Sequence, residues 1–426
     1  MSRRSILLGL ILSLICAGGL SADSKTKSST SPSIKDVHAA FQTPSERIRG
    51  VLHAKLTHAG TDADTPEIVA AVIEGLQPHL NSKAITHSDL NFISWLGTSQ
   101  QQQAVQQLHD WLAFDDLRVV LAASWAMTDN QKAVPWELIV PLTERDTYQK
   151  FYALRRTVVA AAERNASKEA IAYLIKTVRE SDGQLKYEAV LSLMAVTGQG
   201  FGGYAEQWET WWSTASTTFT SPAIQPVAKR SPLKKTNASL QAKVAWKNPV
   251  PRFYNLPVYA RRVLFIIDCS GSMKHVNQGE SRINRARREI ENAIVSLPEE
   301  AHFSIIAFND LPFAFSQSLV LANEENKVAA VRFAQNLVAH KHTNCYDTLS
   351  MALEADPNLE AIFFLSDGEP SCGRIVVPQA IVRAITMQNH LHHTTIYTLG
   401  IDARGNHEFF LKDLAVQNHG EFFSIR

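Results

Sequence analysis

The chain has 426 residues, and its 42 lysines and arginines nearly balance its 41 aspartates and glutamates. That length exceeds what one ordinary hydrophobic core accommodates, so at least two domains are expected. A net charge near zero gives no sign of the cationic surface that nucleic acids or anionic membranes attract, so neither is predicted as a partner.

The amino terminus has the pattern of a secretory signal peptide over residues 1–22. Two arginines precede an apolar run from Ile6 to Ile15, and small residues follow in the stretch CAGGLSA. The run is shorter than the ~20 residues of a spanning helix, so we expect cleavage after Ala22 and no remaining transmembrane span. An uncleaved anchor and a lipid-modified Cys16 are the alternatives. The prediction is an extracytoplasmic protein, in the periplasm, in the cell envelope or secreted.

Residues 23–35 are polar and serine-rich, which predicts a disordered lead. Over residues 36–213, alanine, leucine and valine recur at three- and four-residue steps, as in amphipathic helices. Alanine-rich helices open at intervals of about thirty to thirty-six residues, at Asp116, Asp146 and Asp182. Such a period indicates stacked helical pairs. The segment resembles HEAT-like repeats, although residues 36–110 match the pattern poorly, and an irregular helical bundle is the alternative.

A formal G-x-G-x-x-G string occurs near the end of this helical segment, at Gly198, Gly200 and Gly203. A dinucleotide-binding loop follows a strand, whereas this string follows a predicted helix that ends near Val196. We therefore interpret the match as coincidental. The tryptophans that come next are expected to cap the helical stack, at Trp208, Trp211 and Trp212.

Residues 214–252 are rich in serine, threonine, proline and lysine, and no acidic residue occurs from Thr210 through Ile267. This composition is typical of a flexible, basic interdomain linker. A tether that docks on an acidic surface is the alternative.

Residues 253–426 alternate short strands with helices. The runs VLFIID, HFSIIAF, AIFFLSD and TTIYTLGI are short and rich in Ile, Phe and Val, as strands buried on both faces are. Helical patterns separate them, so we predict an α/β, doubly wound, Rossmann-like domain with a mostly parallel sheet, preceded by the all-α region. Ligands of such folds bind beyond the carboxyl ends of the strands.

Oxygen-bearing side chains stand at those predicted strand ends. Asp268, Ser270 and Ser272 follow the first strand in FIIDCSGSM, Thr343 precedes a helix in HKHTNCYDTL, and Asp367 follows a later strand in LSDGEPS. Carboxylate and hydroxyl oxygens are hard donors, which favour Mg²⁺, with Mn²⁺ or Ca²⁺ possible, over zinc or copper. Helix capping is the alternative role, and it explains Ser272 but not the five residues together.

The segments D-C-S-G-S, T-N-C-Y-D and S-D-G-E-P resemble the three parts of the metal-ion-dependent adhesion site (MIDAS) of von Willebrand factor type A (VWA) domains. The resemblance covers residues 253–426. It implies that Asp268, Ser270, Ser272, Thr343 and Asp367 hold the metal, with Ser270 and Ser272 as direct ligands. It also implies a non-enzymatic binding or adhesion protein, whose partner contributes an Asp or Glu carboxylate to the metal.

Two other functions are compatible with the same residues. The helical region could be the main binder, with the metal only stiffening the rim of the sheet. A metal-dependent hydrolase would need a base, for which the nearest candidates are His340 and His342, interpreted as rim residues. A second histidine group is interpreted as a solvated strand entry, at His390, His392 and His393.

After signal cleavage the chain keeps Cys269, Cys345 and Cys372, an odd number that fits no disulfide framework. A bridge between Cys345 and Cys372 and buried free thiols are both open. The sequence ends at GEFFSIR, interpreted as the last strand. Many VWA domains have one more helix after this strand, and the members that switch affinity do so by sliding that helix. The sequence shows no such helix after GEFFSIR, so we expect a site of fixed affinity here.

Overall fold

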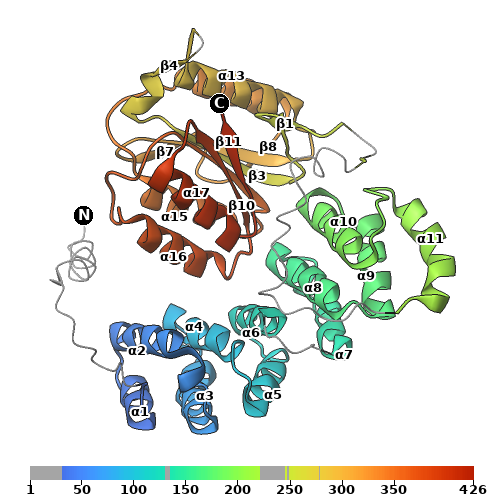
Figure 1. Cartoon of the computed structure of the whole chain (residues 1–426). Coiled ribbons are helices and arrows are strands. Elements are labelled where there is room, and N and C mark those ends of the chain that lie inside the picture. Colours follow the sequence, from blue (N-terminus) through green and yellow to red (C-terminus); the bar gives the residue numbers. More distant parts are fainter. Residues whose placement is uncertain (1–30, 130–134, 221–244, 247–248, 278) are drawn as a thin grey trace.

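The computed structural model describes residues 31–129, 135–220, 245–246, 249–277 and 279–426. The predicted signal peptide and most of the predicted lead and linker lie outside this described part. The described residues form a helical region and an α/β region (Figure 1). No helix among them combines the length and apolarity needed to cross a membrane.

The helical region is a two-layered stack. Helices α2, α4, α6, α8 and α10 pack one on the next, while α1, α3 and α5 form the other layer of the first half and α9 and α11 that of the second. The helical elements are α1 (Ile34–Gln42), α2 (Glu46–Ala59), η1 (Gly60–Ala63), α3 (Pro66–Asn81), α4 (His87–Leu96), α5 (Gln102–Trp111), α6 (Leu117–Asp129), α7 (Trp136–Ile139), η2 (Val140–Glu144), α8 (Tyr152–Asn165), α9 (Lys168–Glu180), α10 (Gly183–Thr197) and α11 (Ala205–Thr218).

This arrangement confirms the predicted helical-repeat-like region and replaces the irregular bundle. The same layering includes α1 to α5, where the sequence pattern is weak, because packing between layers needs buried apolar faces rather than an exact period. The layer with α2, α4, α6 and α8 faces the α/β region (Figure 1).

The observed elements run past two of the predicted boundaries. Helix α1 begins at Ile34, with a capping box at Ser33, so the last residues of the predicted lead are helical. Helix α11 continues to Thr218, five residues beyond the predicted end of the helical region at 213. Near the end of the predicted linker, the Trp246 ring packs against Tyr259 with ring centroids 5.0 Å apart. That part of the linker is docked rather than free.

The α/β region is built on a seven-stranded sheet with the order β11-β10-β9-β3-β6-β7, and β8 also pairs with β6. Strands β3, β6, β9, β10 and β11 are parallel, and β7 and β8 are antiparallel to β6. The strands are β1 (Arg252–Phe253), β2 (Leu256–Pro257), β3 (Arg262–Asp268), β4 (Val276–Asn277), β5 (Glu280–Ser281), β6 (His302–Phe308), β7 (Pro312–Ala314), β8 (Val320–Leu321), β9 (Ala361–Ser366), β10 (Thr395–Ile401) and β11 (Phe422–Ile425).

Helices cover both faces of this sheet, as strands rich in Ile, Phe and Val predict. On β3, Phe265 packs into the core under α13 and Ile266 into the core on the opposite face. The helical elements are η3 (Gly271–Lys274), α13 (Arg282–Ser296), α14 (Glu324–Gln335), α15 (Cys345–Glu354), α16 (Pro378–Asn389) and α17 (Gly405–Gln417). The predicted doubly wound fold is therefore confirmed.

Residues of the α/β region cap two helices of the helical region. The Asn358 side chain accepts a hydrogen bond from the Tyr152 backbone N–H at 2.8 Å, at the start of α8. The buried Glu360 carboxylate accepts one from the Gln184 backbone N–H at 3.0 Å, at the start of α10. Neither helix has a side-chain cap from its own N-cap residue. The turn before β9 thus satisfies backbone donors that would otherwise lack partners.

The predicted solvated histidine cluster is wrong. His393 is fully buried between the two regions, its ring lies 4.4 Å from that of Trp125 on α6, and its carbonyl accepts a 2.7 Å hydrogen bond from Arg156 on α8. Leu391 packs against the helical core. Burial and the Arg156 charge hold the pKa of His393 well below its ordinary value, so the ring is neutral at physiological pH.

Replacing Gly183 with alanine is expected to destabilise the protein by about 1 to 2 kcal/mol more than replacing Gly198 with alanine. Both glycines have left-handed backbones, at φ values of 67° and 71°. A Cβ at Gly183 would lie 2.6 Å from a Glu360 carboxylate oxygen, whereas a Cβ at Gly198 meets nothing within 4 Å. Chemical denaturation of the two variants measures the difference. Equal losses of stability would contradict a close fit between the two regions.

Candidate metal site

The candidate site lies at the carboxyl edge of the sheet, where β3 and β9 run side by side. Asp268 is the last residue of β3, and Asp367 follows directly after the last residue of β9, Ser366. The chain leaves β3 toward β6 on one side, while β9 and β10 lie on the other side. This reversal of direction is the position at which open α/β sheets place their ligands.

Asp268 is held from two sides and is fully buried. Its Oδ1 accepts a hydrogen bond from the Ser270 backbone N–H at 2.7 Å, and its Oδ2 accepts one from the Ser366 hydroxyl at 2.7 Å. Burial, and after it the nearby charge of Asp367, raises the pKa of Asp268 to about 7. A cation at this position would favour the ionised carboxylate by replacing the proton.

The other four predicted residues converge on the same place. The Ser270 and Ser272 hydroxyls are 3.0 Å apart, and the Ser272 hydroxyl donates to Asp367 Oδ1 at 2.6 Å. Thr343 comes from a separate loop, yet a Cβ built on Gly368 would lie 3.5 Å from Ser272 Oγ and 3.6 Å from Thr343 Oγ1. The fold therefore brings all five predicted side chains together around one small space.

Backbone contacts hold Thr343 in place before α15. Its N–H donates to the Ser371 hydroxyl at 2.9 Å, and its carbonyl accepts from the Ser371 N–H at 2.9 Å. The next residue, Asn344, caps α15 by accepting from the Asp347 N–H and also donates to the Asp310 carbonyl. Thr343 thus stands beside a capped helix amino terminus, on loops that are linked to one another.

The donor set fits a hard divalent cation. Two carboxylates and three hydroxyls supply only oxygen, which Mg²⁺, Mn²⁺ and Ca²⁺ prefer. Within the part of the chain that the structure describes, no three His, Cys, Asp or Glu side chains are grouped so as to hold a metal. A cation here would depend on the hydroxyls as much as on the carboxylates.

Three residues of this site were not predicted from the sequence, namely Ser366, Arg282 and Asp402. Ser366 holds Asp268, and Arg282 at the start of α13 reaches Asp367 Oδ2 at 2.7 Å and Asp402 at 2.8 Å. Ser366 could have been found beside the S-D-G motif. Nothing in spacing indicates Arg282, which lies 85 residues before Asp367.

Three cysteines and two rim histidines lie near the candidate site. Cys269, Cys345 and Cys372 are free thiols, which decides against a Cys345–Cys372 bridge. Burial raises the pKa of the Cys269 and Cys345 thiols, and such thiols are poor nucleophiles. His340 and His342 are exposed on the loop that leads to Thr343, as predicted for rim residues.

Comparison with known proteins identifies relatives of the α/β region. Residues 263–369 match the von Willebrand factor type A domain family. Inter alpha-trypsin inhibitor heavy chain 4 of Mus musculus is 29% identical over 180 residues, which are 39% of this chain and 18% of that protein. Inter-alpha-trypsin inhibitor heavy chain H2 of Homo sapiens is 27% identical over 177 residues, with the same coverage of 39% and 18%. The chain thus matches less than one fifth of the length of these relatives.

Solved structures similar to this chain include von Willebrand factor type A from Catenulispora acidiphila, with 22% identity, a TM-score of 0.34 and coverage of 38% of each chain. Another is the conserved hypothetical protein BatB from Bacteroides thetaiotaomicron, with 16% identity and a TM-score of 0.31, covering 38% of this chain and 89% of that chain.

Proposed function

Because its α/β region is a von Willebrand factor type A domain, we propose that this chain is an exported, non-enzymatic binding protein that captures a protein partner through a divalent cation. The cation is Mg²⁺, and the partner contributes an Asp or Glu carboxylate. The residues that hold the cation are Asp268, Ser270, Ser272, Thr343 and Asp367.

One observation carries this proposal: five oxygen side chains from three separate segments meet at the carboxyl edge of the sheet. The chain of hydrogen bonds from Ser366 through Asp268 to Ser270 orients the first carboxylate. The bond from Ser272 to Asp367 ties the second carboxylate to the same loop. A preformed set of this kind supports cation binding without rearrangement of the backbone.

A bound Mg²⁺ would supply an electrophilic coordination position that a carboxylate of a partner protein can occupy. The residues of this chain provide the remaining conditions. The hydroxyls of Ser270, Ser272 and Thr343 are neutral, so they leave positive charge at the site for the partner. The amino terminus of α15, next to Thr343, favours negative charge as well.

The helical region contacts the α/β region at the end of β9 that lies opposite the metal site, and it leaves the carboxyl edge of the sheet open. Glu360 and Asn358 cap the helices just before β9 begins, while Asp367 follows the end of β9. Six residues of strand separate the two ends, a length of about 20 Å. The attachment therefore supports access by a protein partner to the metal edge.

Export is the part of the proposal that rests on residues 1–22. Their arginines, apolar run and small residues form the pattern of a secretory signal. An extracytoplasmic location would place the metal edge in a compartment where surface proteins are available as partners.

Immobilised full-length protein is expected to retain a partner from cell-envelope extract in MgCl₂ and to lose it when EDTA replaces the metal. The physical reason is that the cation is the main attraction for the carboxylate of the partner. Mass spectrometry of the bands lost on chelation identifies the protein. Retention that is the same with and without EDTA would instead favour the helical region as the binder, and would contradict the metal-bridge proposal.

A further inference from the structure

The guanidinium of Arg282 places a positive charge of the protein itself beside the candidate metal site. Its Nη1 lies 2.7 Å from Asp367 Oδ2 and its Nη2 lies 2.8 Å from Asp402 Oδ2. The Asp367 side chain is fully buried, and that of Arg282 is only 16% exposed. An arginine that is mostly shielded from solvent and pairs with two carboxylates is strongly constrained.

The backbone explains why this guanidinium reaches the site. Arg282 is the first residue of α13, and its N–H donates to the His275 carbonyl at 3.0 Å, which closes the β4–β5 hairpin. The hairpin returns the chain to the carboxyl edge of the sheet. Arg282 is thus held by the same loop that carries Ser270 and Ser272.

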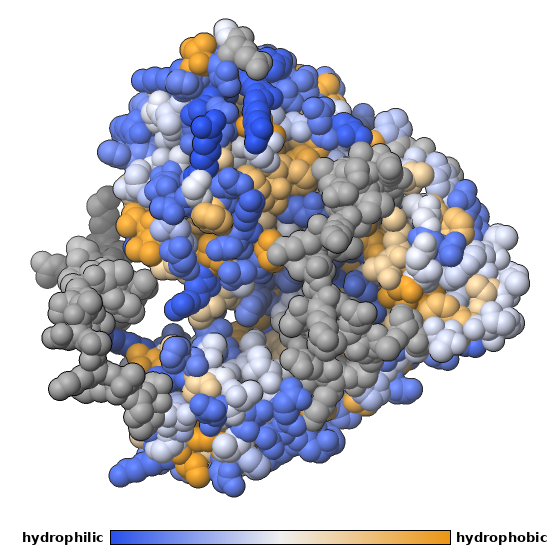
Figure 2. Space-filling view, viewed as in Figure 1, coloured by the Kyte–Doolittle hydropathy of each residue, from blue (hydrophilic) through white to orange (hydrophobic). Residues whose placement is uncertain are grey.

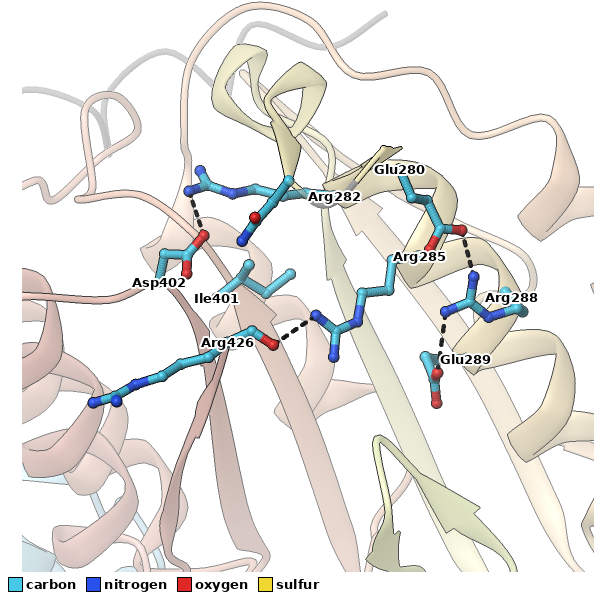
Figure 3. A pocket seen from close by; sticks show the side chains of 9 residues that line it. Glu280, Arg282, Arg285, Arg288, Glu289, Ile401, Asp402 and Arg426 are labelled. Atoms are coloured by element: carbon cyan, nitrogen blue, oxygen red, sulfur yellow. Dashed lines mark hydrogen bonds and ion pairs between the residues drawn. The ribbon is translucent and has the colours of Figure 1, made fainter.

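Beyond Arg282 lies a cavity of about 260 Å³ between the first turns of α13 and the carboxyl ends of β10 and β11, where Ile401, Asp402 and Arg426 line it. Figure 3 shows Arg282 turned toward Asp402, while Arg285 points to the carbonyl of Arg426. The surface over β4 and α13 is mainly hydrophilic (Figure 2). Arg282 therefore stands between a polar cavity and the candidate metal site, and it alone of the cavity arginines contacts Asp367 in the part of the chain that the structure describes.

We infer that Arg282 sets the affinity of the metal site: it is a built-in counter-cation that shares Asp367 with the metal and keeps the affinity for divalent cations low. This inference rests on the proposed function. In the metal-free protein, Arg282 stabilises the buried Asp367 carboxylate. In the loaded protein, its positive charge repels the cation and withdraws part of the charge of Asp367.

Asp402 tunes this effect by sharing Arg282. The guanidinium of Arg282 pairs with two carboxylates at once. It therefore compensates less of the negative charge of Asp367 than it would in an isolated ion pair. Loss of the Asp402 charge leaves the guanidinium to Asp367 alone and makes the neighbourhood one unit more positive. The geometry therefore predicts effects of opposite sign for substitutions at Arg282 and at Asp402.

Calorimetric titration of the full-length protein with MgCl₂, and separately with MnCl₂, tests the inference. Arg282→Gln is expected to bind the cation about tenfold or more tightly than the wild type, since a charge at such short range shifts ion equilibria by at least one order of magnitude. Asp402→Asn is expected to bind it more weakly. The increase in Tm on adding metal should be larger for Arg282→Gln than for the wild type, because its metal-free form holds Asp367 unpaired.

Arg285→Gln is the matched control, since Arg285 lies one turn further along α13, lines the same cavity and carries the same charge without contacting Asp367. Its affinity should change less than about twofold, because the effect of a charge falls with distance and solvent screens it. Weaker cation binding by Arg282→Gln would overturn the inference, and so would unchanged or tighter cation binding by Asp402→Asn. If Arg282→Gln does not fold, the result for Asp402→Asn decides the inference. If the wild type binds the cation but the variants show these reversed effects, only the counter-cation role is contradicted. If neither the wild type nor Arg282→Gln binds the cation, the proposed function is contradicted as well.

Discussion

Replacing Asp268 with asparagine is expected to abolish Mg²⁺ uptake, with a loss of affinity of at least about 100-fold, and to abolish metal-dependent capture of the partner. The substitution keeps the size of the side chain and removes its charge. An asparagine oxygen can still accept from the Ser270 N–H, and the Ser366 hydroxyl can turn to accept from the new amide. Calorimetry with MgCl₂ measures the affinity.

The same variant should fold normally, which separates a binding defect from misfolding. Burial raises the pKa of Asp268 to about 7, so the ionised carboxylate is costly in the metal-free protein at neutral pH. Removing that charge is expected to leave the metal-free Tm unchanged or higher. A marked fall in Tm would mean that Asp268 serves the fold rather than a cation.

Glu369→Gln is the control for Asp268→Asn. Glu369 lies two residues after Asp367 in the same loop, and its side chain is exposed. Removing an exposed charge should change the affinity for Mg²⁺ less than about threefold, because solvent screens it. If both variants lost affinity equally, general surface charge would explain the binding, and the five-residue site would not.

Replacing Arg156 with methionine is expected to lower the free energy of unfolding by about 3 to 5 kcal/mol, the usual cost of breaking a buried ion pair on one side. Arg156 on α8 pairs with Glu188 on α10 at 2.7 Å, and their side chains are 8% and 15% exposed. It also donates to the His393 carbonyl across the two regions. The variant leaves Glu188 charged and poorly solvated. Chemical denaturation of the full-length protein measures the loss.

Two further variants define the cause of that loss. The double variant Arg156→Met with Glu188→Leu should recover most of the stability, because no unpaired charge remains in the interior. Arg179→Met removes an arginine from the more exposed pair with Glu209, whose side chains are 48% and 40% exposed, and should cost less than about 1 kcal/mol. A small effect of Arg156→Met would show that solvent reaches this interface.

Contacts between the two regions concentrate at the amino ends of β9 and β10, and the candidate metal site lies at the opposite ends. Tyr187 of α10 stacks on Tyr259 with ring centroids 3.9 Å apart, and the Thr395 hydroxyl donates to Glu188 at 3.1 Å. Aromatic stacking and buried hydrogen bonds of this kind hold the two regions in one orientation. The helical stack thus serves as a fixed base for the VWA domain.

The amino-acid sequence by itself indicated the five parallel strands, the helical patterns between them and the five candidate site residues. The strand VLFIID is buried on both faces, so its residues from Val263 to Ile267 are all apolar, and the sequence alone indicates the strand. The site residues could be predicted from the sequence because parallel strands end at one edge of a sheet. Asp268 and Asp367 therefore had to approach each other once the strand order was right.

Only the tertiary structure decided what lies between the regions and beside the metal site. The Arg156 contact with His393 joins residues 237 positions apart, and Arg282 meets Asp367 across 85 positions. Periodicity reports the environment of a residue along its own helix or strand, and it holds no information about which distant charge will face it. The burial of His393 and the pairing of Arg282 follow from packing of whole elements, so they could be known only after those elements were placed.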